Sequence, residues 1–150
     1  MSEVKKIFIT GASGGIGSAI CNKFLKQNFT LVITSSSNDK IEKLKHIYGN
    51  NHFYYKVDLS DSSDLKNCLK DVANNHKDIS VIVNNAGITH DSLILRMKDD
   101  QWDKVIQTNL NSNFQIIRAL LPNMLSKRSG KIIGISSIVG TTGNPGQANY

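Results

Sequence analysis

Short apolar runs alternate with longer amphipathic stretches along almost the whole chain. The apolar runs predict buried strands, and the stretches between them have the 3.6-residue period of helices. The predicted strands are residues 5–10, 30–35, 53–57, 79–83 and 131–136. The predicted helices are residues 16–27, 39–48, about 60–75, and 98–126. Strands that alternate with helices in this way predict an α/β fold with a parallel sheet and right-handed crossovers.

The composition is that of one soluble domain with a hydrophobic core. Of the 150 residues, 39% are hydrophobic and 20% are charged. No apolar run approaches the roughly 20 residues that span a bilayer, and the first residues do not form a signal peptide, so we expect a cytoplasmic location and no membrane contact. Cys21 and Cys68 form no redox or metal motif, and the four histidines lack ligand spacing, so we expect reduced thiols and no metal site.

The net charge of +6 narrows the choice of partner. The lysines are scattered, and no basic stripe with interleaved aromatic residues is present, which argues against nucleic acid. A basic surface also suits an anionic cofactor or an acidic protein partner. We therefore expect one of these two and no nucleic acid.

A glycine-rich turn joins the first predicted strand to the first predicted helix. Gly11, Gly15 and Gly17 are spaced Gly-x-x-x-Gly-x-Gly, and Ser13 and Ile16 lie between them. Glycine lets the main chain approach a ligand closely, and a helix N-terminus offers unpaired N–H groups to a pyrophosphate. The turn therefore predicts dinucleotide binding, although a turn with no ligand remains an alternative.

The end of the second predicted strand indicates which dinucleotide is bound. In dinucleotide folds an acid at this place bonds the ribose 2′-hydroxyl and repels a 2′-phosphate. Here Ser35 and Ser36 take that place, and Lys40 is a nearby cation. The hydroxyls and the cation favour NADP. The serines could also cap the next helix, and both roles are compatible.

Two further polar motifs lie where chemistry is expected. The carboxyl ends of strands face the ligand crevice in open α/β sheets, and Asn85, Ala86 and Gly87 follow the fourth predicted strand. Small residues there let a nucleotide lie close. Asn109 lies inside the long helical stretch although asparagine is a poor helix former, which favours a buried polar role over a solvated one.

These motifs, with Ser137 and Tyr150 thirteen positions apart, resemble the short-chain dehydrogenase/reductase family. The resemblance implies a Rossmann-like doubly wound parallel sheet in the order 3-2-1-4-5, which leaves the fifth strand at an edge. It implies that Ser137 donates a hydrogen bond to a substrate carbonyl, that Tyr150 protonates it, and that Asn109 anchors a water. It also implies that Asp58 and Leu59 contact the adenine; capping of the next helix is the alternative for Asp58.

Residues 84–97 and 143–150 most resemble the branch of the family that reduces 3-oxoacyl groups on acyl carrier protein. The implied reaction is NADPH-dependent reduction of a 3-oxoacyl thioester to the 3-hydroxyacyl form in fatty acid biosynthesis. Lys127 and Arg128 match a place where the family meets its acidic carrier, although they also suit an ordinary helix end. A homotetramer is implied as well. Reduction of another ketone, or oxidation of an alcohol, is the alternative within the family.

The family continues with a lysine four residues after the tyrosine and with further strands and helices, at positions beyond residue 150. Residues 1–150 therefore predict an NADP-binding Rossmann domain that lacks its C-terminal strands and helices. A tyrosine holds its proton until about pH 10 unless a cation lies near. We accordingly expect the 150-residue chain alone to be inactive or nearly so. A remnant that at most binds nucleotide is the non-enzymatic alternative.

Overall fold

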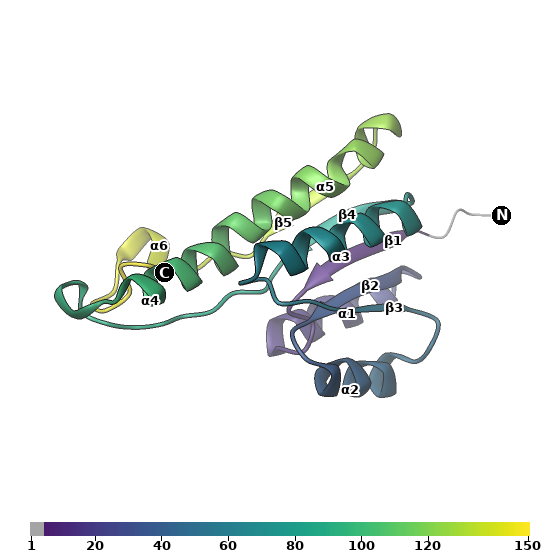
Figure 1. Ribbon diagram of the computed structural model, residues 1–150. Helices are drawn as coiled ribbons and strands as arrows, with labels where there is room; N and C mark the ends of the chain where they lie inside the picture. The colour runs from purple at the N-terminus through teal and green to yellow at the C-terminus, as the bar shows by residue number, and fades with distance from the viewer. Residues whose placement is uncertain (1–4) are drawn as a thin grey trace.

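The computed structural model describes residues 5–150 and contains a five-stranded parallel sheet (Figure 1). The strands are β1 (Lys6–Thr10), β2 (Thr30–Ser35), β3 (Phe53–Lys56), β4 (Ile79–Asn84) and β5 (Lys131–Gly134). Their order is β3-β2-β1-β4-β5, and every neighbouring pair is parallel. Successive strands are added on one side of β1 as far as β3 and on its other side from β4 onward, which makes the sheet doubly wound and confirms the predicted fold class and strand order.

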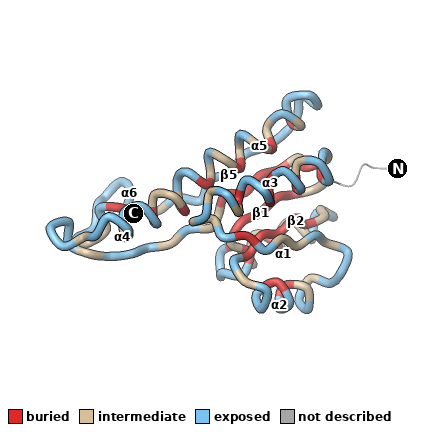
Figure 2. The backbone as a smooth tube through the Cα atoms, viewed as in Figure 1, coloured by how far each residue is buried: buried red, intermediate tan, exposed pale blue. Residues whose placement is uncertain are grey.

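Helices cover both faces of the sheet. They are α1 (Gly15–Leu25), α2 (Asn38–Tyr48), α3 (Ser62–Asn75) and α5 (Ser112–Ser126). Side chains of β1 alternate between two buried clusters: Phe8 packs with α3 and α5, and Ile7 and Ile9 pack with α1 and α2. All three are fully buried, and β1, β2 and β4 form the buried centre that is drawn red in Figure 2. Burial on both faces explains why these strands are continuously apolar.

The predicted helix at residues 98–126 is not a single α-helix. It consists of α4 (Asp99–Ile106), a π-helical turn η2 (Gln107–Asn111) and α5. Ser112 donates its hydroxyl to the Thr108 carbonyl at 2.6 Å, so side chains take part in the hydrogen bonding of the turn. A π-turn inserts one extra residue into a helix and is frequent at functional sites. Asn109 lies within it.

Three departures from the predicted elements concern short segments. Two single turns, η1 (Ile94–Arg96) and α6 (Val139–Thr142), were not predicted, because one turn is too short to show a helical period. β5 ends two residues earlier than predicted. It lies at the edge of the sheet as expected, and Ile132 and Ile133 are 44% and 38% exposed.

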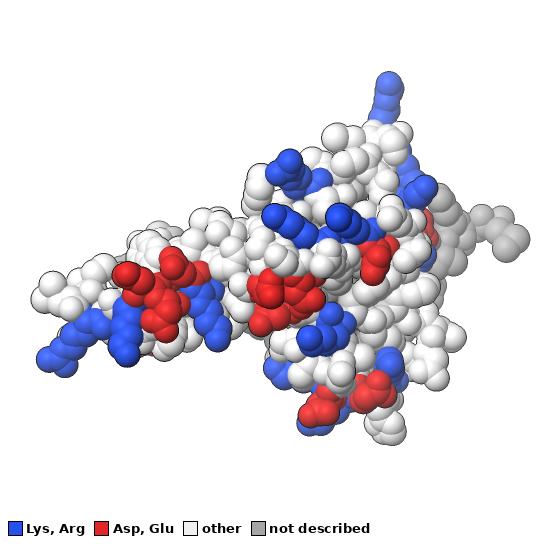
Figure 3. All heavy atoms as spheres, in the orientation of Figure 1, with Lys and Arg blue, Asp and Glu red and all other residues white. Residues whose placement is uncertain are grey.

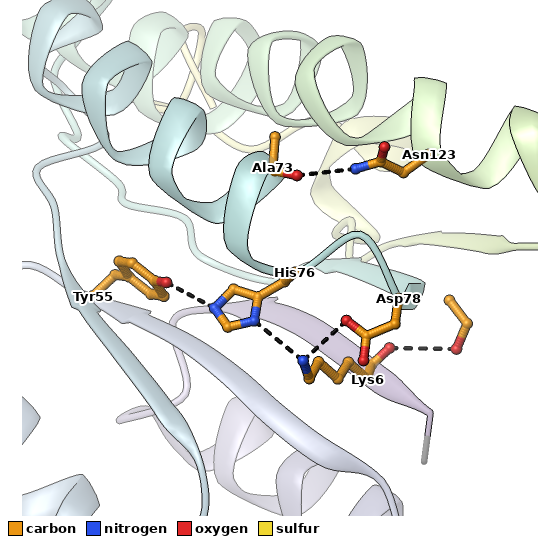
Figure 4. A network of polar contacts seen from close by, with 7 residues as sticks. Lys6, Tyr55, Ala73, His76, Asp78 and Asn123 are labelled. Atoms are coloured by element: carbon orange, nitrogen blue, oxygen red, sulfur yellow. Dashed lines mark hydrogen bonds and ion pairs between the residues drawn. The ribbon is translucent and has the colours of Figure 1, made fainter. Parts of the chain in front are cut away.

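A polar network centred on the buried His76 joins β1, β3 and the turn before β4 (Figure 4). His76 is 2% exposed; its Nε2 lies 2.7 Å from the Tyr55 hydroxyl, and its Nδ1 lies 3.4 Å from Lys6 Nζ. Because an ammonium only donates, Nδ1 accepts and the imidazole proton is on Nε2. Lys6 also pairs with Asp78 at 2.9 Å. Burial is the main cause that lowers the pKa of His76, and the positive charge of Lys6 adds to it.

Candidate functional site

A cleft of about 600 Å³ lies at the carboxyl edge of the sheet. The structure brings together in its lining all the residues that were predicted to bind the cofactor. These are Gly11, Ser13, Gly15, Ile16, Gly17, Ser35, Ser36, Asp58, Leu59, Asn85, Ala86 and Gly87. Eight further residues complete the lining. These are Gly14, Thr34, Lys40, Val57, Ser60, Ile88, Lys104 and Thr108.

The three glycines of the first turn are needed for different physical reasons. Gly11 has a φ of +70°, and a Cβ there would lie 2.9 Å from Ala86 Cα; a Cβ at Gly17 would overlap the Gly11 carbonyl oxygen. No protein atom lies within 4 Å of a Cβ at Gly15. Packing therefore requires glycine at Gly11 and Gly17. It does not require glycine at Gly15, where the missing side chain leaves room for a ligand.

The N-terminus of α1 opens into this cleft without a side-chain cap. Its N-cap is Gly14, and the first turn contains no acidic residue. The N–H groups of that turn and the positive end of the helix dipole are therefore available to an anion. This arrangement fits the pyrophosphate of a dinucleotide.

Hydrogen bonds tie the glycine turn to the end of β4. The Thr10 hydroxyl oxygen accepts from the Asn85 and Ala86 N–H groups at 3.1 and 3.0 Å. In return, Asn85 Nδ2 donates to the carbonyls of Thr10 and Gly11 at 3.0 and 3.1 Å. Asn85 was predicted to contact the cofactor; it lines the cleft, and its side chain also holds the glycine turn in place.

The serines after β2 divide two tasks between them. Ser37 is the N-cap of α2: its hydroxyl oxygen accepts a hydrogen bond from the Lys40 N–H at 3.4 Å. Ser35 and Ser36 line the cleft instead, and Lys40 Nζ lies 3.5 Å from Ser36 Oγ. The capping interpretation is confirmed for Ser37, whereas phosphate binding by Ser35 and Ser36 stays a prediction.

Asp58 is the only acid among the described residues that line the cleft. Its Oδ1 accepts from the N–H and the hydroxyl of Ser60 at 2.9 and 2.7 Å. These hydrogen bonds, helped by the nearby charge of Lys104, hold the pKa of Asp58 below its usual value. The interpretation of Asp58 as the helix cap is wrong, because Asp61 caps α3.

Asn109 clamps the loop that follows β4. Its Oδ1 accepts from the Ile88 N–H at 2.9 Å, and its Nδ2 donates to the Ile88 carbonyl at 2.8 Å. Its own carbonyl accepts from Asn113 at 2.7 Å. The solvated interpretation of Asn109 is therefore wrong. Because both polar side-chain atoms are engaged with the loop, the part expected of Asn109 in holding a water remains a prediction.

Ser137 and Tyr150 come from the segment after β5 and are not among the residues that line the cleft. The Ser137 hydroxyl oxygen accepts from the Val139 N–H at 3.3 Å, at the start of α6. Tyr150 is 41% exposed. Its segment contacts the loop after β4, where the Ser92 N–H donates to the Gly146 carbonyl at 2.8 Å. The Tyr150 segment thus lies beside the loop that Asn109 clamps.

Three residues near the site were missed by sequence reasoning. Lys104 and Thr108 line the cleft from α4 and η2. They are four positions apart, so helical spacing places them on one face and could have indicated them. Asn149, 5% exposed, is buried beside Tyr150 and carried no sequence signal, because its environment is built by tertiary contacts.

Residues 5–150 contain neither a metal-binding cluster nor a membrane-spanning helix. No group of three or more His, Cys, Asp or Glu side chains there is arranged to hold a metal ion. None of the helices in this range has the length and apolar character needed to cross a membrane. On the face drawn in Figure 3, basic and acidic side chains are interspersed.

Comparison with known proteins decides the family. The family model described as short chain dehydrogenase matches residues 5–150. The chain belongs to the short-chain dehydrogenase family. The cleft at the carboxyl edge, the glycine turn and the Tyr150 segment described above are therefore parts of a short-chain dehydrogenase fold.

Curated relatives of this short-chain dehydrogenase carry a common name. Proteins named 3-oxoacyl-[acyl-carrier-protein] reductase FabG are 40% identical in Staphylococcus aureus, 38% in Salmonella typhimurium and 43% in Rickettsia typhi. The alignments cover 100%, 99% and 97% of this chain, and 63%, 61% and 59% of the relatives. The chain thus spans about three fifths of the length of these relatives.

A solved structure has the same fold. A short-chain dehydrogenase from Streptomyces avermitilis superposes with a TM-score of 0.90 at 27% identity. It covers 100% of this chain, and this chain covers 56% of it. The family supports an oxidoreductase with a nicotinamide cofactor.

Proposed function

We propose that this short-chain dehydrogenase reduces 3-oxoacyl thioesters of acyl carrier protein with NADPH, in cytoplasmic fatty acid biosynthesis. The names of the relatives support the substrate, and the lining of the cleft supports the cofactor. Because this chain spans about three fifths of the length of these relatives, the activity is proposed for a protein of their full length.

The observation that carries the choice of NADPH is the end of β2. Ser35, Ser36 and Lys40 line the cleft there, and the only acid in the described lining, Asp58, follows β3. A 2′-phosphate would meet two hydroxyls and an ammonium, and no carboxylate at the β2 end would repel it. The ribose 2′-hydroxyl of NADH would find no carboxylate at the β2 end to accept its hydrogen bond.

The remaining lining residues can receive the rest of the cofactor. We assign the pyrophosphate to the glycine turn and the first turn of α1, because these offer free N–H groups. We assign the adenine to Asp58 and Leu59. We assign the nicotinamide ribose to residues 85–87, where small side chains leave room above the end of β4.

In the proposed reaction NADPH, when bound, supplies the hydride that is added to C3 of the 3-oxoacyl group. The Ser137 hydroxyl donates a hydrogen bond to the 3-oxo oxygen and stabilises the negative charge that develops on it. The Tyr150 phenol donates its proton to the same oxygen, which gives the 3-hydroxyl group. Asn109 supports these residues by holding the loop beside them.

The cofactor assignment is tested by exchanging single serines for aspartate. Ser36→Asp places a carboxylate where we assign the 2′-phosphate, and should lower the ratio of NADPH to NADH efficiency, measured as kcat/KM on an acetoacetyl thioester, by at least about 100-fold. Ser37→Asp is the matched control, since aspartate is an equally good N-cap. A wild-type preference for NADH, or an equal change in both variants, would contradict the assignment.

Lys127 and Arg128 are the proposed contact for the acyl carrier protein. Lys127 and Arg128 lie between the end of α5 at Ser126 and the start of β5 at Lys131, at the amino ends of the strands, whereas the cleft lies at their carboxyl ends. A carrier bound there would have to present its acyl chain across the sheet or to another subunit of the proposed homotetramer. Arg128→Glu should raise KM for the carrier-bound substrate but not for a small thioester; an unchanged KM would exclude Arg128 as a contact.

A further inference from the structure

The segment that carries Tyr150 has almost no regular structure of its own. After the single turn α6, the chain passes through Gly143 and Gly146, with φ values of +72° and +83°. Such a segment gains its geometry from contacts with its surroundings, because glycine-rich loops are intrinsically mobile. A side chain that donates a proton must nevertheless be held within fractions of an ångström. Something outside the segment must therefore fix it.

Asn149, the residue before Tyr150, makes two hydrogen bonds to different parts of the chain. Its Nδ2 donates to the carbonyl of His90, in the loop after β4, and to the carbonyl of Gln101, in α4; both distances are 3.1 Å. Since both partners are carbonyl oxygens, only the amide nitrogen can face them. Asn149 is 5% exposed, and its Oδ1 is buried with no partner among the described residues. The side chain is therefore committed to this bridge.

A second set of contacts involves Gln147, two residues before Asn149. Gln147 Nε2 donates to both carboxylate oxygens of Asp91 at 3.1 and 3.2 Å. The backbone of Gln147 forms a parallel bridge with Ser92, whose N–H donates to Gly146. The Tyr150 N–H in turn donates to the Gln147 carbonyl at 3.1 Å. The backbone next to Tyr150 is thus held at several consecutive residues.

The same loop joins Tyr150 to Asn109. Asn109 binds both backbone groups of Ile88, and Asn149 binds the backbone of His90 two residues later. Two residues of the proposed catalytic set are therefore positioned against one short stretch, residues 88–92. A shift of this stretch would move Tyr150 relative to the cleft.

We infer that Asn149 is a positioning residue, whose buried amide fixes the backbone of Tyr150 against the loop after β4 and against α4. The inference rests on the proposed role of Tyr150. Asn149→Asp keeps the size of the side chain but turns an oxygen toward two carbonyls, so both hydrogen bonds are lost and replaced by repulsion. Asn149→Ala removes the bridge without adding charge and serves if the first variant does not fold.

The first readout is amide hydrogen exchange in the full-length chain, which needs no enzymatic activity. Exchange at the Ser92 and Tyr150 N–H groups should accelerate at least about 10-fold in either Asn149 variant. The Ile88 N–H should keep its protection, because its acceptor is Asn109. Asn123→Asp is the matched control: Asn123 Nδ2 also donates to a backbone carbonyl, that of Ala73, in a half-buried contact between α3 and α5 (Figure 4).

The second readout is kinetic. On a 3-oxoacyl thioester, kcat should fall about 10- to 100-fold in the Asn149 variants, while KM for NADPH stays within twofold, because Asn149 does not line the cleft. Unchanged exchange at Ser92 and Tyr150, or an equal fall of kcat in Asn123→Asp, would overturn the inference. A wild-type protein without reductase activity would refute the proposed function, and exchange would still decide whether Asn149 fixes Tyr150.

Discussion

The glycine turn allows one pair of substitutions to separate folding from ligand binding. Gly17 is buried, and a Cβ there would overlap the Gly11 carbonyl oxygen and lie 2.8 Å from both the Gly11 carbonyl carbon and Asn85 Nδ2. Backbone atoms cannot give way as a flexible side chain can. Gly17→Ala should therefore lower the free energy of unfolding by about 1–3 kcal/mol. In a chain of this size that corresponds to roughly 2–4 °C of Tm for each kcal/mol.

Gly15→Ala should behave in the opposite way. Gly15 is exposed in the first turn of α1, and no protein atom lies within 4 Å of the added methyl group. Alanine is a better helix former by about 0.5–1 kcal/mol, so the stability of the free protein should be unchanged or slightly raised. The methyl group would, however, enter the space that we assign to the pyrophosphate. Binding of NADPH should weaken about 100-fold.

Thermal or urea unfolding with and without NADPH measures both effects. At a concentration of 100 times Kd the wild type gains about 2.7 kcal/mol from the ligand, whereas a 100-fold weaker complex gains about 0.4 kcal/mol. Retention of the full ligand stabilisation in Gly15→Ala would refute the placement of the pyrophosphate. A Gly17→Ala variant as stable as the wild type would refute the close approach of α1 to the turn.

Three further predictions follow from buried groups. Because burial lowers the pKa of His76 from its ordinary value of 6.5, the unfolded chain binds a proton more readily than the folded one. The free energy of unfolding should therefore be at its full value above about pH 6.5 and should fall below that pH, by up to about 1.4 kcal/mol per pH unit. Urea unfolding between pH 7.5 and 5 should show a flatter pH dependence in His76→Gln than in the wild type. An identical slope in both proteins would contradict this. Burial also raises the pKa of Cys21 and Cys68 to about 11, so at pH 8 only about one thiol in a thousand is ionised, and maleimide labelling should be slow in buffer and rapid in urea; equal rates would count against it. Asn85→Asp turns a carboxylate oxygen toward the carbonyls of Thr10 and Gly11. The variant should lose about 2–4 kcal/mol of unfolding free energy and should also lose nucleotide binding. If calorimetry shows that stability and binding are both retained, the link between Asn85 and the glycine turn is dispensable.

The parts of the fold that the sequence predicted are those with local signals. The apolar strands and the periodic helices predicted an α/β fold with a parallel sheet, and the resemblance to the short-chain dehydrogenase/reductase family implied the order of its strands. The residues around Gly11, Ser35, Asp58 and Asn85 line one cleft because each follows the carboxyl end of a strand. Their binding of a cofactor stays a prediction.

The features that were missed depend on contacts between distant segments. The π-turn around Asn109 accompanies side-chain bonds to the Ile88 backbone, 21 positions earlier, which no window along the chain reveals. The burial of Asn149 likewise depends on α4. Asp58 and Asp61 are both plausible caps by type, and only the backbone geometry assigns the cap to Asp61.

The Thr10 hydroxyl has a consequence for how long the neighbouring strand can be. By accepting two consecutive N–H groups, those of Asn85 and Ala86, it takes the donors with which β4 would otherwise continue its ladder. A side chain of β1 thus acts as a stop signal for β4 and sets the level at which the chain turns away from the sheet. Thr10→Val, nearly identical in shape, would leave both donors without this acceptor. The hydroxyl of one β1 residue therefore fixes the position of two residues that line the cleft, Asn85 and Ala86.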